Sequence, residues 1–477
     1  LSYCGEVVAR AEELTMAQVL PALPPMGVAG SVEAVHSVDE DLKQYLLNPD
    51  LVLKPRSEWP TKLKRSRMFI KKSEWQKLGP ELVRRKIMKP IEKSRLIEHN
   101  GAYLVNTIFG VGKGKFTWSE DQQNEMEILR LIINLVPSNE LQDVMEGDVG
   151  TLPHFCQWSG IELDMDEILI WGSEDISCAF YVFALPDRWC PYFVVDWPLD
   201  PQLWGGEGTE PQYLALAVIP MGWSSAVNVC QRCLRGVGLM PAGRGANLPA
   251  DKELRKDRSL PVDAFGKVRS FFQQYIDNWD GCSITLLSNL LGIDPSKLEV
   301  EEWKDQLRAG YTLWGIPRAP DKSTLGFDAM TLGATLDRYR AQAKLGEAKT
   351  CDYIGLTWFL LQQRCPKVKD TSMGLGRWTF SFQLRRPFMM LLQECWKVVS
   401  GDIAPQHRAM YLREELLGCL CSLPLLAIDF RTMASPMVTC SDASESAGGM
   451  CYSRTATAAG RDFLGLTARS LGAGRVY

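Results

Sequence analysis

The chain has 477 residues, of which 46% are hydrophobic and 23% are charged. This composition excludes a disordered chain and a small disulfide scaffold, and the length allows about three domains with their own cores. The 53 Lys and Arg against 57 Asp and Glu give a net charge of −4. That balance excludes a uniformly basic nucleic-acid coat protein, but it permits local basic surfaces.

Nothing in the sequence indicates export, a membrane span or structural zinc. The longest apolar run, residues 416–428, is shorter than the roughly 20 residues that cross a bilayer. The first residues lack the basic-then-apolar order of a signal peptide. Cys230 and Cys233 form a CxxC pair without a second pair at zinc-ribbon spacing. We therefore expect a soluble, intracellular protein with reduced thiols and no membrane partner, in the cytoplasm or the nucleus.

The first part of the chain divides into a leader and a basic stretch. Residues 1–52 are predicted to form a poorly ordered leader, because Pro and Gly in residues 21–30 interrupt its one weak helical pattern. Residues 53–115 then carry 17 Lys and Arg against five Glu. Such a run is typical either of a solvated helix face or of a surface that binds a polyanion.

The remainder of the chain mixes strand and helix patterns. The predicted strands lie at residues 168–171 and 192–195, the predicted hairpin at 271–285, and the predicted helices at 300–313 and 388–399. The hairpin is centred on a turn-forming cluster, residues 277–281. Residues 236–266, rich in Pro, Gly and charge, indicate a surface insertion. Together these patterns predict an α+β fold with helical appendages.

Two acidic residues stand at the ends of predicted strands. Asp175 follows an apolar strand, and Asp277 lies at the tip of the predicted hairpin, 102 residues later. Carboxylates at the ends of neighbouring strands can hold two Mg²⁺ ions about 3.5–4 Å apart for an in-line phosphoryl transfer. Taken singly, each Asp is more often a turn or cap residue. Only a tertiary fold that brings them together would support a metal site.

Several segments of the chain resemble those of reverse transcriptases of the retrotransposon and retroviral type. They occur along the chain in the same order as in that family. Residues 173–186 (SEDISCAFYVFALP) resemble the first catalytic motif, and residues 275–278 (YIDN) resemble the YxDD hairpin. The other similar segments are 129–139 (LRLIINLVPSN), which ends in a loop-closing Asn, 219–226 (IPMGWSSA), 315–317 (GIP) with Lys322, and 332–333 (LG). Each segment is short, but their common order makes coincidence improbable.

The resemblance implies a right-hand polymerase fold with fingers, an antiparallel palm sheet and a thumb. The implied domains are the leader at 1–52, fingers at 53–160, palm at 161–345 with the insertion 236–266, thumb or connection at 346–432, and an incomplete ribonuclease H-like segment at 436–477. The implied activity is that of an RNA-directed DNA polymerase. It transfers a nucleotide from a dNTP to a primer 3′-hydroxyl, with two Mg²⁺ ions or with Mn²⁺ in their place.

The resemblance also implies roles for individual residues. The catalytic residues are Asp175, Asp277 and Asn278, and the metal ligands are Asp175, the carbonyl of Ile176, and Asp277. The nucleotide-binding residues are Arg130, Lys113, Lys115, Phe180, Met221 and Gly222. Phe180 falls where this family keeps a ring against the sugar, which would exclude a 2′-hydroxyl. The stretch from Gly110 to Lys115 lacks the spacing and the Ser or Thr of a P-loop, which excludes that interpretation.

One departure from the family pattern leaves the activity open. The second Asp of the YxDD hairpin is Asn278 here, which offers a neutral oxygen in place of a charge. Asp280 is expected to point the wrong way to replace it. The alternative function is therefore a catalytically decayed remnant of the same fold that binds nucleic acid without catalysis. A third possibility is an unrelated function on a palm-like sheet.

The expected partners are an RNA template, a DNA primer and a dNTP, while the oligomeric state stays open. The residues expected to track the nucleic-acid backbone are Lys62, Lys64, Arg65, Arg84, Arg85, Arg377, Arg385 and Arg386. Residues 438–452 (VTCSDASESAGGMCY) resemble the opening strand of a ribonuclease H domain, with Asp442 at the metal-binding position. Because only 35 residues follow Asp442, that domain is expected to be truncated and inactive.

Overall fold

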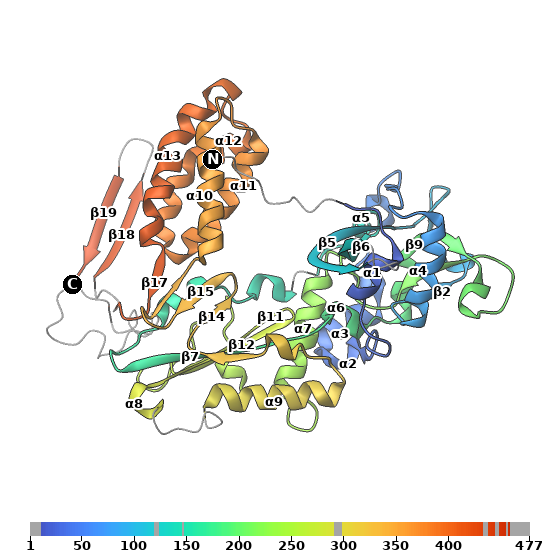
Figure 1. Cartoon of the computed structure of the whole chain (residues 1–477), viewed down its shortest axis with the longest axis horizontal. Coiled ribbons are helices and arrows are strands. Elements are labelled where there is room, and N and C mark those ends of the chain that lie inside the picture. Colours follow the sequence, from blue (N-terminus) through green and yellow to red (C-terminus); the bar gives the residue numbers. More distant parts are fainter. Residues whose placement is uncertain are drawn as a thin grey trace.

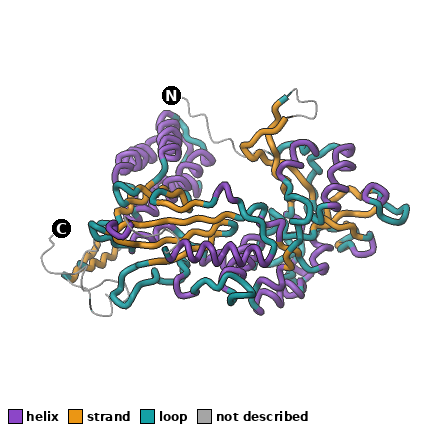
Figure 2. The backbone as a smooth tube through the Cα atoms, turned by 60° about the horizontal axis from the view of Figure 1, so that its bottom comes forward, coloured by secondary structure: helices purple, strands orange, loops and turns teal. Residues whose placement is uncertain are grey.

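The computed structural model describes residues 11–118, 124–145, 147–290, 298–432, 437–443, 448–454 and 457. Within these residues the fold is α+β, as predicted (Figure 1). A central antiparallel sheet connects an N-terminal body to a C-terminal helical bundle, and its strands run between the two in Figure 2. No helix in the described part of the chain is both long and apolar enough to cross a membrane.

The central sheet has the strand order β11-β12-β7-β13, and every pair in it is antiparallel. Its strands are β7 (Glu167–Asp175), β11 (Ser270–Tyr275), β12 (Asn278–Leu286) and β13 (Thr324–Gly326). The predicted hairpin is therefore confirmed, but its turn is only Ile276 and Asp277. Residues 278–281 continue the strand, because Trp279 is fully buried there and this burial outweighs the turn propensity of its neighbours.

The two faces of the central sheet bury different cores. Along β7, Ile170 joins the core of the N-terminal body, while Leu169 and Trp171 join the core of the helical bundle. Along β11, Phe272 joins the core of the N-terminal body and Phe271 joins the core of the helical bundle. Successive side chains of a strand point to opposite faces, so a continuous apolar run suits a sheet that is covered on both sides.

Helix α9 (Glu299–Trp314) packs on the N-terminal-body face of this sheet and confirms the helix predicted at 300–313. Two glycines allow the close approach. A Cβ on Gly172 would lie 2.8 Å from the Lys304 side chain, and one on Gly281 would lie 2.8 Å from Val300. The helix ends at Gly315, which has a φ of 69°. α8 (Leu287–Leu290) follows β12 directly.

The N-terminal body contains short strands, a long two-stranded ribbon and several helices. β2, β10 and β9 form a three-stranded sheet, while β5 and β6 form the ribbon. Its elements are α1 (Met16–Val19), β1 (Val32–Glu33), α2 (Ala34–Ser37), α3 (Glu40–Leu47), α4 (Lys72–Arg84), β2 (Met88–Ile91), β3 (Glu98–His99), β4 (Ala102–Tyr103), β5 (Thr107–Trp118), β6 (Glu125–Asn134), α5 (Val136–Asn139), α6 (Ala179–Val182), β8 (Phe183–Ala184), β9 (Val194–Leu199), β10 (Gln212–Leu216) and α7 (Ala226–Leu239).

The prediction of a poorly ordered leader is wrong for residues 11–52. Leu14, Val19, Leu42 and Leu46 are fully or almost fully buried in the core of the N-terminal body. β1 also pairs with β8, far along the chain. Leu42 and Leu46 follow the helical period of α3, whereas the burial of Leu14 and Val19 depends on tertiary contacts that local sequence patterns do not show.

The packing of α2 against α7 gives a testable prediction. A Cβ on Gly236 would lie 1.8 Å from the backbone oxygen of Ser37, a contact that only a backbone shift can relieve. We expect Gly236→Ala to lower the free energy of unfolding by about 3 kcal/mol, measured by urea denaturation. The matched control is Gly376→Ala, because Gly376 is an exposed helical glycine with no atom near its Cβ position. The control should raise stability by about 0.5–1 kcal/mol, and equal effects of both changes would contradict the prediction.

The segment 236–266 is not simply a surface insertion. Its first residues belong to α7, and Ala246, Leu248 and Leu254 are buried. The Leu254 N–H donates to the Phe272 oxygen at 2.7 Å, which attaches the segment beside β11. The Pro, Gly and charge content correctly indicated an irregular path, but three spaced apolar residues still bury that path against the sheet.

The C-terminal part is a helical bundle on a small sheet, followed by a hairpin. Of the helix predicted at 388–399, only the second half is α-helical. The elements are β14 (Ala329–Thr331), β15 (Ala334–Asp337), β16 (Gln342–Lys344), α10 (Glu347–Gln362), α11 (Val368–Ser381), α12 (Gln393–Ser400), α13 (Arg408–Ser422), β17 (Ala427–Asp429), β18 (Val438–Ala443) and β19 (Gly448–Ser453). β18 and β19 pair with each other in an antiparallel hairpin.

Candidate functional site

Asp175 and Asp277 lie next to each other at one end of the central sheet. Asp175 is the last residue of β7, and its partner across the sheet is Asn278, the first residue of β12. Asp277 immediately precedes Asn278 in the turn. The Ile176 N–H donates to the backbone oxygen of Asp277 at 3.0 Å, which joins the two segments directly. The structure therefore brings together Asp175, Ile176, Asp277 and Asn278, although 102 residues separate the two Asp in sequence.

The turn that carries Asp277 is held in an unusual conformation. Ile276 has a φ of 53°, a region that β-branched residues rarely adopt. Its N–H donates to Oε1 of Gln231 at 2.6 Å, and its backbone oxygen accepts from Nε2 of Gln274 at 2.8 Å. Both glutamines are buried, so the turn is fixed from two sides. No sequence motif indicated Gln231 or Gln274, and the spacing of the hairpin gave no signal for them.

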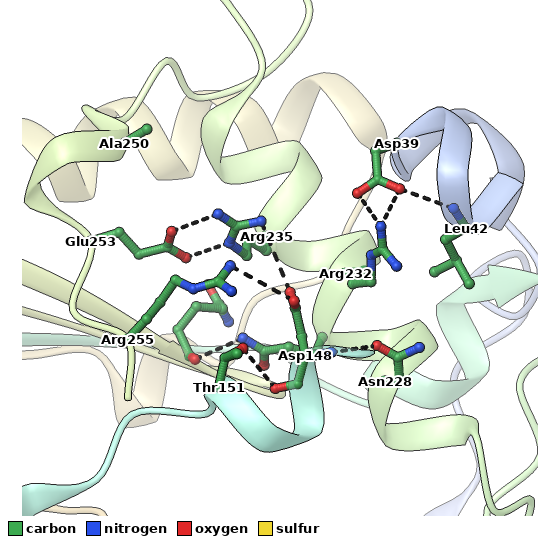
Figure 3. A network of polar contacts seen from close by, with 12 residues as sticks. Asp39, Leu42, Asp148, Thr151, Asn228, Arg232, Arg235, Ala250, Glu253 and Arg255 are labelled. Atoms are coloured by element: carbon green, nitrogen blue, oxygen red, sulfur yellow. Dashed lines mark hydrogen bonds and ion pairs between the residues drawn. The ribbon is translucent and has the colours of Figure 1, made fainter. Parts of the chain in front are cut away.

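Gln231 lies on α7, and ion pairs fix this helix to the surrounding chain (Figure 3). Arg232 pairs with Asp39 in the N-terminal segment. Arg235 donates from Nε and Nη2 to the two carboxylate oxygens of Glu253 at 2.6 and 2.8 Å. Such bidentate contacts fix a planar guanidinium. The helix that positions the turn is therefore tied to two distant parts of the sequence.

The electrostatics of the aspartate pair indicate a site for cations. Burial and the neighbouring Asp175 carboxylate raise the pKa of Asp277 above its usual value. Nζ of Lys322 donates to Oδ1 of Asp175 at 2.9 Å, and this contact raises the pKa of Lys322. Two adjacent carboxylates with one ammonium between them leave a net negative charge. In the sequence, Lys322 belongs to a segment that resembles the reverse-transcriptase family, but it was not among the predicted site residues.

The donor set fits Mg²⁺ better than a softer metal. The carboxylates of Asp175 and Asp277 and the amide oxygen of Asn278 are hard oxygen ligands. In the described part of the chain, no cluster of three or more His, Cys, Asp and Glu residues could hold a metal ion by itself. Mg²⁺ commonly uses one or two carboxylates and completes its shell with water and substrate phosphates. The geometry therefore suits an ion that a phosphate-bearing substrate shares.

The raised pKa of Asp277 predicts an effect on stability. A carboxyl group whose pKa is higher in the folded than in the unfolded chain costs stability when it is ionised. This cost is present above the raised pKa and disappears as the pH falls toward 3.8, the ordinary value. We expect Asp277→Asn to raise the Tm of the metal-free protein at pH 7, with a gain that shrinks toward pH 4. Thermal unfolding across this range tests it, with exposed Asp328→Asn as the control. A gain that grew on acidification would contradict it.

The loop after β7 carries Cys178 and Phe180 beside the aspartate pair. Phe180 is half-buried on α6 and packs against the core of the N-terminal body. Burial raises the pKa of the Cys178 thiol, while the ammonium groups of Lys113 and Lys322 act in the opposite direction. Lys113 belongs to the β5–β6 ribbon, so the ribbon reaches toward the same loop.

The ribbon displays the other two predicted phosphate-binding residues. Arg130 on β6 pairs across the ribbon with Val111, and both Arg130 and Lys115 are exposed. The stretch from Gly110 to Lys115 forms part of strand β5 and not a helix-capping loop, which agrees with the rejection of a P-loop. The structure therefore places all three predicted cations on one ribbon, and the charge of Lys113 acts on Cys178 in the loop after Asp175.

Gly222 allows a close contact between two backbone segments. It has a φ of 114°, and a Cβ there would lie 2.4 Å from the backbone oxygen of Ile133 on β6. Its own backbone oxygen accepts from Nδ2 of Asn139 at 2.9 Å. Asn139 therefore closes this loop, as its motif predicts. Met221 is half-buried against the core of the N-terminal body.

The predicted nucleic-acid-binding residues of the basic stretch fall into two groups. Lys62, Lys64 and Arg65 are exposed, and Lys64 pairs with Glu140. Arg84 and Arg85 both pair with Glu81 one turn earlier on α4. Arg85 is mostly buried and also donates to the backbone oxygen of Pro24, so it fixes the N-terminal segment. Arg85 is therefore committed to contacts within the chain. The Arg84 side chain is 56% exposed, and the single Glu81 carboxylate balances only one of the two charges, so nucleic-acid binding by Arg84 stays a prediction.

The arginines of the helical bundle that were predicted to bind nucleic acid also fall into two groups, one buried and one exposed. Arg377 is buried, with its guanidinium 5.7 Å from the centre of the Tyr353 ring, so the prediction that it contacts a nucleic-acid backbone is wrong. Its position in the core of the bundle follows from the helical period of α11, which turns this residue inward. Arg385 and Arg386 are exposed. Burial lowers the pKa of His154, and the charges of Lys256 and Arg386 act in the same direction.

Two further acids that the sequence singled out are Asp442 and Asp280. Asp442 lies in β18, paired with Gly449 of β19, as expected for a strand followed by a glycine hairpin. Asp280 is fully buried, and its two oxygens accept hydrogen bonds from Trp171, Ser173 and Thr331, so it does not stand in for the second Asp of the hairpin. Nδ2 of Asn278 donates to Oδ2 of Asp280 at 2.8 Å, because residues two apart on a strand share a face.

No protein-family profile and no curated protein sequence matches the chain. Solved structures similar to it include three of the foamy viral protease-reverse transcriptase. The form described as dRH with ds DNA has a TM-score of 0.49 and 12% identity over 91% of this chain and 68% of that chain. The complex with RNA/DNA hybrid has 0.46 and 12% over 88% and 49%. The complex with dsDNA has 0.47 and 14% over 88% and 76%.

Proposed function

We propose that this protein is an RNA-directed DNA polymerase that adds a dNTP to a primer 3′-hydroxyl. The observation that carries the proposal is the pairing of Asp175 with the turn that holds Asp277, at one end of the central sheet. This is the arrangement that phosphoryl transfer with two divalent ions requires. The charge of Lys113 on the β5–β6 ribbon acts on Cys178 in the loop that follows Asp175. The proposed domains are fingers, palm and thumb in the order that the resemblance implies.

In this proposal the chain positions the reactants and balances charge. Bound Mg²⁺, or Mn²⁺ in its place, would polarise the phosphoryl oxygens and lower the pKa of the attacking hydroxyl. Asp175, Asp277 and the Ile176 carbonyl would hold the ions, with Asn278 beside them. Arg130, Lys113 and Lys115 neutralise the triphosphate charge through the β5–β6 ribbon. Phe180 and Met221 shape the pocket for the sugar and the base.

The remaining exposed cations are proposed to bind the template and primer. Lys62 and Arg65 lie on the N-terminal body, and Arg385 and Arg386 lie on the helical bundle, so the two sets flank the central sheet. Contacts of this kind bind phosphates without reading sequence. Binding should therefore weaken steeply as the salt concentration rises.

Primer extension on poly(rA)/oligo(dT) tests the proposal. The full chain is incubated with dTTP and either Mg²⁺ or Mn²⁺, and the products are resolved by length. Extension that requires the metal is the expected result. A chain that binds the duplex but extends no primer with either metal would overturn it.

The departure at Asn278 favours a second candidate, a nucleic-acid-binding protein of the same fold without catalysis. Asn278 removes one negative charge from a site that must hold divalent cations. The same extension assay, combined with duplex binding by fluorescence anisotropy, separates the two. Salt-sensitive binding without extension supports the second candidate.

A further inference from the structure

Asp280 is a fully buried acid that the proposed polymerase chemistry leaves without a role. It lies on β12 and is 0% exposed. Its Oδ1 accepts from Nε1 of Trp171 at 3.3 Å and from Oγ of Ser173 at 2.6 Å. Its Oδ2 accepts from Nδ2 of Asn278 at 2.8 Å, from Nε2 of Gln273 at 3.2 Å and from Oγ1 of Thr331. Every one of these partners is a neutral donor.

The Asp280 carboxylate depends on hydrogen bonds from neutral donors. Among the residues that the structure describes, no Lys, Arg or His forms an ion pair with Asp280. A buried carboxylate without a cation is stable only if its oxygens accept enough hydrogen bonds. An aspartate at position 278 would offer no N–H and would add a second negative charge against Asp280. The buried acid therefore favours an amide at position 278.

The same contact decides how the Asn278 side chain is turned. Because Nδ2 is directed at Asp280, the Oδ1 of the same planar amide is directed the other way. No hydrogen bond to that oxygen is made within the described residues. The residue opposite Asn278 across the sheet is Asp175, and the residue before it is Asp277. The free amide oxygen thus lies at the same end of the central sheet as the two carboxylates.

We propose that Asp280 is a positioning residue that orients Asn278, so that the amide oxygen serves as a neutral ligand beside Asp175 and Asp277. This role rests on the proposed function, since it assumes that divalent ions bind at the aspartate pair. It gives the departure at Asn278 a physical reason. The Asn278–Asp280 pair is a unit in which the acid stands two residues further along the strand and acts through the amide. The simple reversal Asn278→Asp breaks this unit.

The first test needs no metal and compares thermal unfolding of the full chain at pH 7.5. Asn278→Asp should lower the Tm by about 4 °C, because it faces Asp280 with a like charge. The exchange variant Asn278→Asp with Asp280→Asn should regain most of that loss, since an amide again faces a carboxylate. The control Asp328→Asn should not change the Tm, because Asp328 is exposed on a different part of the chain. An Asn278→Asp chain as stable as the wild type would overturn the proposal.

The second test measures Mn²⁺ affinity from the electron paramagnetic resonance signal of free Mn²⁺. Asp280→Asn removes the charge but keeps an oxygen that accepts from Asn278, so its affinity should stay within about threefold of the wild type. Asp280→Ala removes the acceptor and should weaken binding about tenfold, as expected for a lost contact behind a metal ligand. Asn278→Ala should weaken binding to a similar degree. The double variant Asn278→Ala with Asp280→Ala should bind no more weakly than Asn278→Ala alone.

The outcomes separate this role from the proposed function. Wild-type binding of Mn²⁺ together with undiminished binding by Asp280→Ala overturns the positioning role and leaves the polymerase proposal in place. A wild-type chain that binds no Mn²⁺ overturns the proposed function and this role with it. If Asp280→Ala does not fold, the Mn²⁺ affinity of Asn278→Ala and the Tm of the exchange variant still test the positioning role, because neither measurement uses Asp280→Ala.

Discussion

Asp175→Asn and Asp277→Asn are each expected to lower the rate of primer extension by at least about 1000-fold. Each change removes one of the two ionised oxygen ligands that meet at the end of β7 and the β11–β12 turn. An amide of the same shape keeps the packing but supplies no negative charge to hold a divalent ion. The loss should therefore appear in catalysis, while the fold and the affinity for a primer–template duplex stay close to those of the wild type.

The measurement is single-turnover extension on poly(rA)/oligo(dT), with duplex affinity followed separately by fluorescence anisotropy. Asp328→Asn is the matched control, since it makes the same substitution at an exposed acid of the neighbouring segment. Extension by both variants within about tenfold of the wild-type rate would show that the aspartate pair does not hold the catalytic ions.

Phe180→Val is expected to reduce the preference for dNTP over rNTP by about 100-fold. Phe180 follows Asp175, the last residue of β7, by five residues and is held on α6, half-buried against the core of the N-terminal body. A ring held in this way cannot retreat far when a ribose 2′-hydroxyl enters the pocket. Valine removes most of the ring and opens that space, so ribonucleotides should be accepted.

The ratio of kcat/KM for dGTP and GTP on poly(rC)/oligo(dG) measures this preference. Phe180→Tyr is the control, because it retains the ring and should keep the preference. A valine variant whose discrimination equals that of the wild type would show that Phe180 is a packing residue and not a sugar gate.

The strands and the aspartate site were within reach of the sequence because their signals are local. The apolar run before Asp175 predicts β7, and the apolar residues on both sides of Asp277 predict the hairpin. The order of the motifs then implies that these two strands are neighbours. That inference required the resemblance, since the two aspartates are 102 residues apart.

Other features were beyond the reach of local patterns. Within the segment 11–52, Leu42 and Leu46 follow a helical period, but no local pattern indicates that this segment contacts α7 and β8. The i,i+4 pair of Arg85 with Glu81 is visible in the sequence and could have been weighed against nucleic-acid binding. The burial of Arg377 follows from the packing of the bundle around α11.

By itself, the sequence determined the mixed α+β character, the strands that carry Asp175 and Asp277, and the family whose motif order they resemble. Only the tertiary structure decided that Gln231 and Gln274 hold the strained turn and that Lys322 contacts Asp175. It also decided that Asn278 is bound to Asp280. The reason is physical. Backbone patterns record which face of a strand is buried, whereas the partner of a polar side chain depends on which distant segment packs against that face.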